Sequence, residues 1–288
     1  MTYAVGDRPS RGPPSPTRNQ SMKTRLSLLL VVAACVAGAA ETNELEKTDD
    51  GGGLSAEASV DVLSDYIWRG KICNDNPVWQ PSVTLGYDAG DFGSASFNVW
   101  SSFDATHRRG TATNSRRSCG AQEFDYTLSY ANTIGPVGLE AGHIWYTFPN
   151  NNGHSDQDLY GTVSYDNDYV TPSASAYWNY SDSADTDPSA VYFAFALARD
   201  FKPMDALTVT PKASLGFGDH AYTCSEGGTE LTDQTLGVAA SYAITKWFSV
   251  GAQVNYTWTP SHTLRHEGYM GEGKHQIVWG GINATISF

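Results

Sequence analysis

Acidic side chains, with two basic ones, recur at alternate positions of segments that otherwise alternate between apolar and small polar residues. The acidic members are Glu57, Asp61, Asp65, Glu123, Asp125, Glu140 and Asp158, and the basic members are Arg69 and Lys212. If one face of a closed sheet surrounds a lumen, these side chains line it, and their acidic excess concentrates cations and repels anions. A second interpretation is that the opposed charges pair into a ladder that plugs a narrow barrel.

One histidine, His143, lies well inside a segment with strand alternation, on its apolar face. A lipid-acting hydrolase could use such a base, but it would need a nucleophile beside it. The adjacent position on the same face is Trp145 and not a serine. A histidine among boundary aromatics is the simpler interpretation, so we expect no enzyme activity.

Metal and cofactor chemistry find little support. His262 and His266 with Glu267 could bind a metal ion, but solvated loop residues explain them better. The sequence contains no phosphate-binding glycine loop, nucleotide fingerprint or zinc motif. We therefore predict no cofactor and no metal site.

Three cysteines, Cys73, Cys119 and Cys224, follow the N-terminal region, and all stand in expected loops. An oxidising compartment permits a disulfide there, and the odd number leaves one thiol over. We favour a pair between Cys73 and Cys119. Metal binding is the weaker interpretation, because no C-x-x-C spacing occurs.

The elements that must position the charged residues are strands. In 54–69, Ala58, Val60 and Val62 alternate with Ser59 and Asp61, and the alternation continues through Tyr66 and Trp68 to Arg69. Eleven further segments of about 10 residues repeat the pattern at intervals of about 18 to 20 residues, enough for a tilted strand to cross a bilayer. We therefore predict an all-β fold over 54–288, a closed antiparallel up-and-down transmembrane β-barrel of about twelve strands.

Two further regularities favour a membrane barrel over a soluble sandwich. Short turns alternate with long polar loops, as expected for periplasmic turns and external loops. Aromatics on the apolar faces collect at both ends of the strands, which suits rings at a water–lipid boundary. The predicted aromatic girdles contain Tyr66, Trp68, Trp79, Tyr87, Tyr130, Trp178, Tyr242, Trp258 and Phe288. Backbone groups that face hydrocarbon cannot find water, so such a sheet must close on itself.

The N-terminal part reads as an export signal. Residues 1–21 are polar and Pro-rich and are expected to be a non-native extension before Met22. Residues 22–40 have the basic, apolar and small-residue regions of a cleaved signal peptide. The residues 32–35 also loosely fit a lipoprotein box, which would make Cys35 a lipidation site. Residues 41–53 are expected to be a disordered acidic leader. The net charge of −13 argues against a nucleic-acid partner.

The last residues, 280–288, resemble the closing strand of bacterial outer-membrane proteins, which typically ends in an aromatic. Ser64-Asp65-Tyr66-Ile67-Trp68-Arg69-Gly70 and Tyr146-Thr147-Phe148-Pro149-Asn150 resemble segments of the uncharacterised TorF-like porins of Gram-negative bacteria. This resemblance implies an outer-membrane barrel, recognised by the barrel-insertion machinery through the strand ending in Phe288.

Together these patterns predict a porin-like channel for small hydrophilic solutes, with a plugged structural barrel as the main alternative. Outer-membrane lipids and lipopolysaccharide are the expected surroundings. The basic residues Arg108, Arg109, Arg116 and Arg117 of one external loop could contact lipopolysaccharide phosphates or fold into the pore, although a solvated loop is as good an interpretation.

Overall fold

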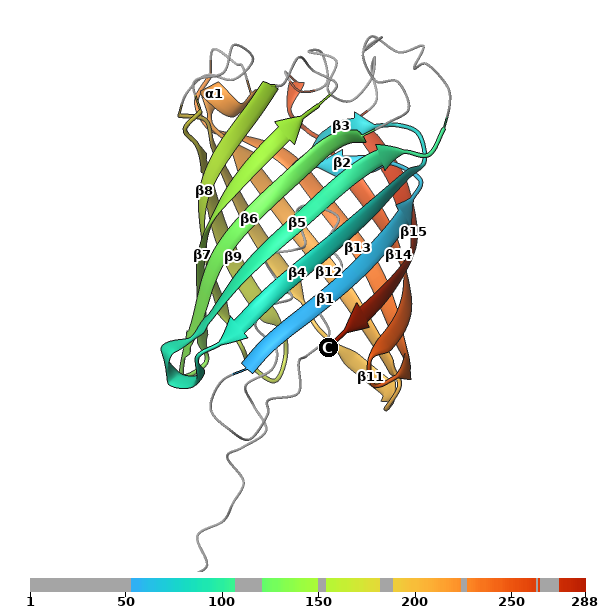
Figure 1. Cartoon of the computed structure of the whole chain (residues 1–288). Coiled ribbons are helices and arrows are strands. Elements are labelled where there is room, and N and C mark those ends of the chain that lie inside the picture. The colour runs from blue at the N-terminus through green and yellow to red at the C-terminus, as the bar shows by residue number, and fades with distance from the viewer. Residues whose placement is uncertain are drawn as a thin grey trace, which may run out of the picture.

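The computed structural model describes residues 53–106, 121–149, 154–181, 189–223, 227–262, 264 and 275–288. Across these ranges the chain builds one closed wall of antiparallel strands (Figure 1). The wall strands are β1 (Gly53–Leu63), β4 (Val78–Asp88), β5 (Ser94–Asp104), β6 (Ala121–Ile134), β7 (Val137–Phe148), β8 (His154–Tyr165), β9 (Thr171–Asn179), β10 (Val191–Ala198), β12 (Leu207–Gly218), β13 (Glu230–Thr245), β14 (Phe248–Trp258) and β15 (Gln276–Ser287).

Neighbours in sequence are neighbours in the wall, and two pairings complete the ring. Strand β1 pairs with β15, with Val60 opposite Ala284, and β10 pairs with β12. The prediction of a twelve-stranded barrel is therefore confirmed for the described residues. Because the strand number is even, the start of β1 and the C-terminus lie at the same end of the barrel (Figure 1).

The connections differ between the two ends. At the end that holds the C-terminus, β6 and β7 are joined across 135–136, and Gly135 there has a φ of 61°. A 3-10 turn, Gly90–Phe92, joins β4 and β5, and the short β11 (Phe201–Met204) pairs with β12. The opposite end, called here the loop end, carries the hairpin of β2 (Tyr66–Trp68) and β3 (Lys71–Asn74) and the one-turn helix α1 (His220–Thr223).

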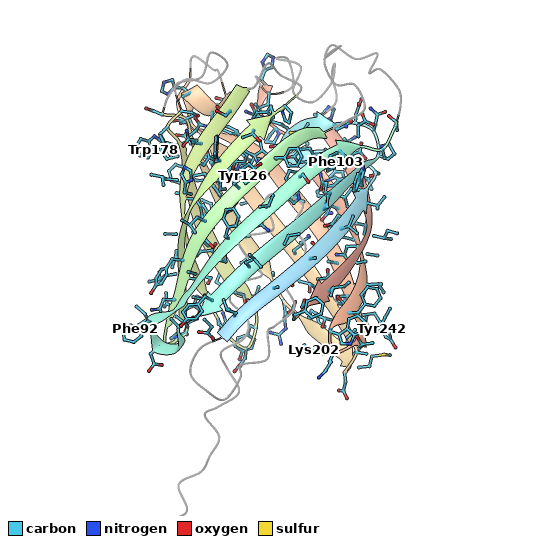
Figure 2. All side chains as sticks on the ribbon, viewed as in Figure 1. Phe92, Phe103, Tyr126, Trp178, Lys202 and Tyr242 are labelled. Atoms are coloured by element: carbon cyan, nitrogen blue, oxygen red, sulfur yellow. The ribbon has the colours of Figure 1, made fainter. Side chains whose placement is uncertain are left out.

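The apolar side chains of the wall strands point outward. Val83, Leu128 and Leu236 are exposed, whereas their polar sequence neighbours face the interior. Most residues of the predicted girdles share this outer face and are exposed: Trp79, Tyr87, Tyr130, Trp178, Tyr242, Trp258 and Phe288. Figure 2 shows Trp178 and Phe103 near the loop end and Phe92 and Tyr242 near the other end. Among the described residues, no helix combines the length and the apolar character needed to span a bilayer.

Strand pairing is unusually close where β1 meets β15. A Cβ atom built on Gly281 would lie 1.9 Å from the carbonyl oxygen of Val62, which is a backbone atom and cannot swing aside. We expect Gly281→Ala to destabilise the barrel by at least about 1–3 kcal/mol, the usual cost of overpacking. The denaturant midpoint of unfolding in lipid vesicles measures this cost.

Gly161→Ala is the matched control, because a Cβ there meets only the carbonyl oxygen of Glu140, at 3.9 Å. Equal midpoints for the two variants would show that the approach of β1 and β15 is looser than described.

Candidate functional site

The charged residues predicted to line a lumen lie inside the barrel or at its loop end. Glu57, Asp61, Glu123, Asp125, Glu140, Asp158 and Lys212 stand on the wall strands at positions that alternate with the exposed apolar side chains. Asp65 lies in the turn between β1 and β2. Arg69 is buried at the tip of the β2–β3 hairpin. Their role as pore-lining residues remains a prediction.

The first segment departs from its prediction after Leu63. The chain leaves the wall there, and Tyr66 is 3% exposed in a cluster with Leu63, Ile67, Val78 and Trp279. Trp68 is half-buried and packs edge-on against Tyr146, a residue of β7. The assignment of Tyr66 and Trp68 to an aromatic girdle was therefore wrong. Both rings fill the interior, because the β2–β3 hairpin folds into the barrel.

The tip of this hairpin needs a reversed backbone. Arg69 has a φ of 45° and Gly70 a φ of 78°, in the left-handed region that glycine adopts most readily. A Cβ on Gly70 would lie 2.9 Å from Cβ of Asp233 on β13. The absence of a side chain thus lets the tip approach the wall closely.

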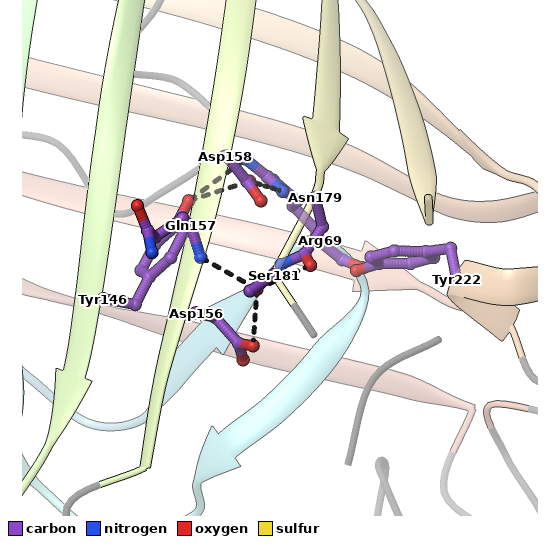
Figure 3. Close-up of polar contacts among 8 residues, drawn as sticks. All are labelled: Arg69, Tyr146, Asp156, Gln157, Asp158, Asn179, Ser181 and Tyr222. Atoms are coloured by element: carbon purple, nitrogen blue, oxygen red, sulfur yellow. Dashed lines mark hydrogen bonds and ion pairs between the residues drawn. The ribbon is translucent and has the colours of Figure 1, made fainter. Parts of the chain in front are cut away.

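Arg69 joins the hairpin to one side of the wall (Figure 3). Its Nη1 donates to Oδ2 of Asp158 on β8 at 2.8 Å, and the two side chains are 5% and 1% exposed. The hydroxyl of Tyr146 donates to the same carboxylate oxygen at 3.1 Å. The guanidinium carbon lies 3.8 Å from the ring centroid of Tyr177 and 4.5 Å from that of Trp68. The buried charge is therefore paired, hydrogen-bonded and stacked on aromatic faces.

Backbone carbonyls of the same tip bind elements elsewhere around the barrel. The hydroxyl of Tyr222, in α1, donates to the Arg69 carbonyl at 2.9 Å (Figure 3). The hydroxyl of Thr259, just after β14, donates to the Gly70 carbonyl at 3.2 Å. The tip is thus held by β7 and β8 and also by α1 and the end of β14, so it crosses the lumen.

A second set of contacts near Asp158 fixes the loop-end edge of β8 and β9. The backbone N–H of Gln157 donates to Oγ of Ser181 at 3.1 Å. The Ser181 hydroxyl lies 3.0 Å from Oδ1 of Asp156 and 2.9 Å from Oδ1 of Asn179 (Figure 3). These bonds hold the chain after β9 against β8, next to Asp158, the ion-pair partner of Arg69.

Burial changes the acid–base behaviour of the hairpin. It raises the pKa of the Tyr66 phenol well above its ordinary value, and the charge of Glu123 adds to the rise. For Arg69, burial alone would lower the pKa, but Tyr146 and Asp158 raise it more, so the guanidinium stays charged. The Tyr66 phenol therefore stays neutral and the Arg69 guanidinium stays charged near neutral pH.

Below the hairpin, the inner wall is polar, and its side chains range from half-buried to buried. Pairs of hydroxyls face each other across neighbouring strands, such as Ser96 with Ser129 and Thr162 with Ser175, both at 2.8 Å. Lys212 reaches Gln253 at 3.4 Å. Such a surface can hold water and small polar solutes. At the hairpin level, Gln80 and Ser102 have no exposed surface.

The lipid hydrolase and the metal site are the two chemical alternatives raised by the sequence. His143 lies on the outer face and contacts Tyr180 and Gln157, so its described side-chain partners include no serine nucleophile. Within the described residues, no group of three or more His, Cys, Asp and Glu side chains could hold a metal ion. His266 and Glu267 lie outside that part of the chain.

Several sequence-based predictions also fall outside the described residues. These are the N-terminal extension, signal peptide and most of the acidic leader, Cys35, the loop arginines 108, 109, 116 and 117, and two of the three later cysteines, Cys119 and Cys224. The Cys73–Cys119 disulfide therefore remains a prediction.

Comparisons with known proteins give only distant structural similarity. No protein-family model and no curated protein matches the sequence. Among solved structures, the COG4313 outer-membrane channel from Pseudomonas putida F1 superposes with a TM-score of 0.49 at 10% identity, covering 86% of this chain and 100% of that one. The KdgM porin in complex with disordered oligogalacturonate gives 0.45 at 10% identity, covering 81% and 99%. The NanC porin gives 0.45 at 10% identity, covering 82% and 99%. The TorF-like resemblance is not confirmed by these matches.

Proposed function

We propose that the protein is a porin-like channel of the bacterial outer membrane, in which the β2–β3 hairpin forms the constriction for small hydrophilic solutes. The observation that carries this proposal is that the closed sheet has its apolar face outside and its polar face inside, the reverse of a water-soluble barrel. Val83, Leu128, Leu236 and similar side chains cover the exterior, while hydroxyls, amides and charges face inward. This arrangement is stable where acyl chains surround the barrel and water fills it.

The charges inside support a preference for cations. Arg69 is neutralised by its ion pair with Asp158, so it adds no net positive field. Glu57, Glu140 and the carboxylates near the hairpin then outweigh Lys212 on the described inner wall. A lumen of this sign attracts cations and repels anions. The reversal potential of single channels in a salt gradient tests this preference.

A plugged barrel is the second candidate, and one observation favours it. Polar side chains at the hairpin level, such as Gln80, Ser102 and Thr257, have almost no exposed surface. These particular side chains therefore line no open passage while the hairpin is in place. The two candidates therefore differ in whether solutes pass when the hairpin moves.

Replacing residues 65–76 with a Gly/Ser chain of the same length should separate the candidates. We expect a several-fold rise in single-channel conductance in planar bilayers, because the lumen loses the rings of Tyr66 and Trp68 and the ion pair between Arg69 and Asp158. The control replaces the shorter segment 202–204, in the exposed strand β11 at the other end of the barrel, with Gly and Ser residues. A silent wild-type protein together with a silent hairpin variant would support a structural barrel and contradict the channel.

A further inference from the structure

A shallow groove runs across the outer face of β7, β8 and β9, with a volume of about 630 Å³. Its floor is a row of small residues in direct register: Ala141 on β7 opposite Gly161 on β8, and Gly161 opposite Ala176 on β9. Tyr130 on β6 continues this row at one end and Phe193 on β10 at the other. Two alanines and a glycine between two aromatic rings leave a hollow in the outer face of the wall.

Polar side chains border this groove on the side toward the loop end. His143 stands two residues beyond Ala141 along β7, and Gln157 and Tyr180 lie on the same outer face of the neighbouring strands. Nε2 of His143 lies 2.8 Å from the Tyr180 hydroxyl and 3.3 Å from Oε1 of Gln157. Polar groups are costly on a face turned to lipid. Trp178, on the same face, lies near the loop end in Figure 2, which places the cluster at the boundary of the apolar band.

The hydrogen-bond donors of this cluster determine which atoms of a ligand it can bind. The Tyr180 hydroxyl donates its one proton to Oε1 of Gln157 at 2.8 Å. His143 must then donate from Nε2 to the Tyr180 oxygen, since a phenol has a single hydrogen. The two N–H bonds of the Gln157 amide take no partner among the described residues. They are available to an acceptor oxygen outside the protein, such as that of a phosphate, an ester or a sugar.

We infer that this groove and the His143–Gln157–Tyr180 cluster together bind lipopolysaccharide, with an acyl chain in the groove and a headgroup oxygen on the cluster. The ligand must be amphiphilic, because an apolar hollow and a polar cluster adjoin on one face. The cluster lies toward the loop end, which meets the outer leaflet when the long polar loops are external, as the sequence predicts. The inference rests on the proposed outer-membrane location but not on channel activity.

The test uses the full-length barrel in detergent, with added deep-rough lipopolysaccharide or phosphatidylglycerol followed by native mass spectrometry. Ala176→Leu fills the groove, and Tyr180→Phe removes the proton donated to Gln157. The matched controls are Ala252→Leu, at an exposed alanine of β14, and Tyr256→Phe, which removes a similar outward bond from Tyr256 to Gln276 at 2.8 Å. Heat-modifiable gel migration first establishes that each variant is folded.

We expect Ala176→Leu and Tyr180→Phe to weaken lipopolysaccharide binding by about tenfold, the scale of one or two lost contacts, with both controls unchanged. Equal binding by all four variants, or phosphatidylglycerol binding as tight as that of lipopolysaccharide, would overturn the inference. Conductance is recorded separately for the same preparations. A silent wild-type barrel that still binds in the expected order would contradict the channel alone, and a conducting barrel with indifferent variants would contradict the lipid site alone.

Discussion

Arg69→Leu should lower the free energy of unfolding by about 3–5 kcal/mol, because it leaves the Asp158 carboxylate buried without its cation. Asp158 is 1% exposed, and within the described part of the chain its Oδ2 atom keeps the hydrogen bond from the Tyr146 hydroxyl. The variant also removes the guanidinium that stacks on Tyr177 and Trp68. Unfolding by guanidinium chloride in lipid vesicles, monitored by tryptophan fluorescence, measures the loss of unfolding free energy.

Two controls give this result its meaning. Lys212→Leu removes the other cation of the predicted lumen set. Lys212 is half-buried, and its Nζ lies 3.4 Å from the amide oxygen of Gln253, so a much smaller change is expected. The double variant Arg69→Leu with Asp158→Leu should recover much of the loss, because it removes the uncompensated charge. If Arg69→Leu and Lys212→Leu cost the same, the ion pair does not hold the hairpin.

Val254→Arg should destabilise the barrel by about 2–4 kcal/mol, the cost of a cation on the lipid face near the bilayer midplane. Val254 lies near the middle of β14, is 55% exposed and stands opposite Val238 on β13. In water, an exposed valine could be replaced by arginine at little cost. Vesicle titration of this variant therefore measures the surroundings of the outer face directly.

Thr245→Arg is the depth control, because Thr245 is exposed at the turn end of β13. Its expected cost is about 0–1 kcal/mol, as at the membrane interfaces. A Val254→Arg barrel as stable as Thr245→Arg would show that no acyl chains touch β14, and the membrane proposal would fail with it.

The wall of this barrel could be predicted because strand geometry fixes a period of two. Val250, Ala252 and Val254 follow one another on one face of β14, and Ser249, Gly251 and Gln253 on the other. A single pattern thus determines both the element and its orientation, once polar residues are taken to face water. Short turns such as 135–136 and 246–247 then set the antiparallel order.

The hairpin could not be predicted by the same reasoning. The alternation of Tyr66 and Trp68 with Ile67 and Arg69 continues that of β1, but period two does not reveal whether a strand faces lipid or packs inside the barrel. The segment 54–69 is longer than the roughly 9–11 residues that cross a bilayer, and this length was the available signal that the chain leaves the wall. The partners of Arg69 come from β7 and β8, which no local pattern could identify.

The outer groove was missed for a related reason. Ala141, Gly161 and Ala176 are ordinary small residues in their own strands, and they become a hollow only because the registers of three strands align them. Register across a wall depends on turn geometry at both ends of every strand. His143 was recognised as unusual, but its partners Tyr180 and Gln157 belong to other strands and could not be assigned.

The pairing of β1 with β15 constrains the order in which the molecule can assemble. The Ser287 hydroxyl donates to the Glu57 carboxylate across 230 positions of sequence, so the final ladder joins the two extremes of the folded chain. Neighbouring hairpins can form early, but the cylinder cannot seal until synthesis has delivered its last residues. Contacts this distant make folding slow. Until then both edge strands carry unpaired backbone groups, which can pair with the strands of other chains.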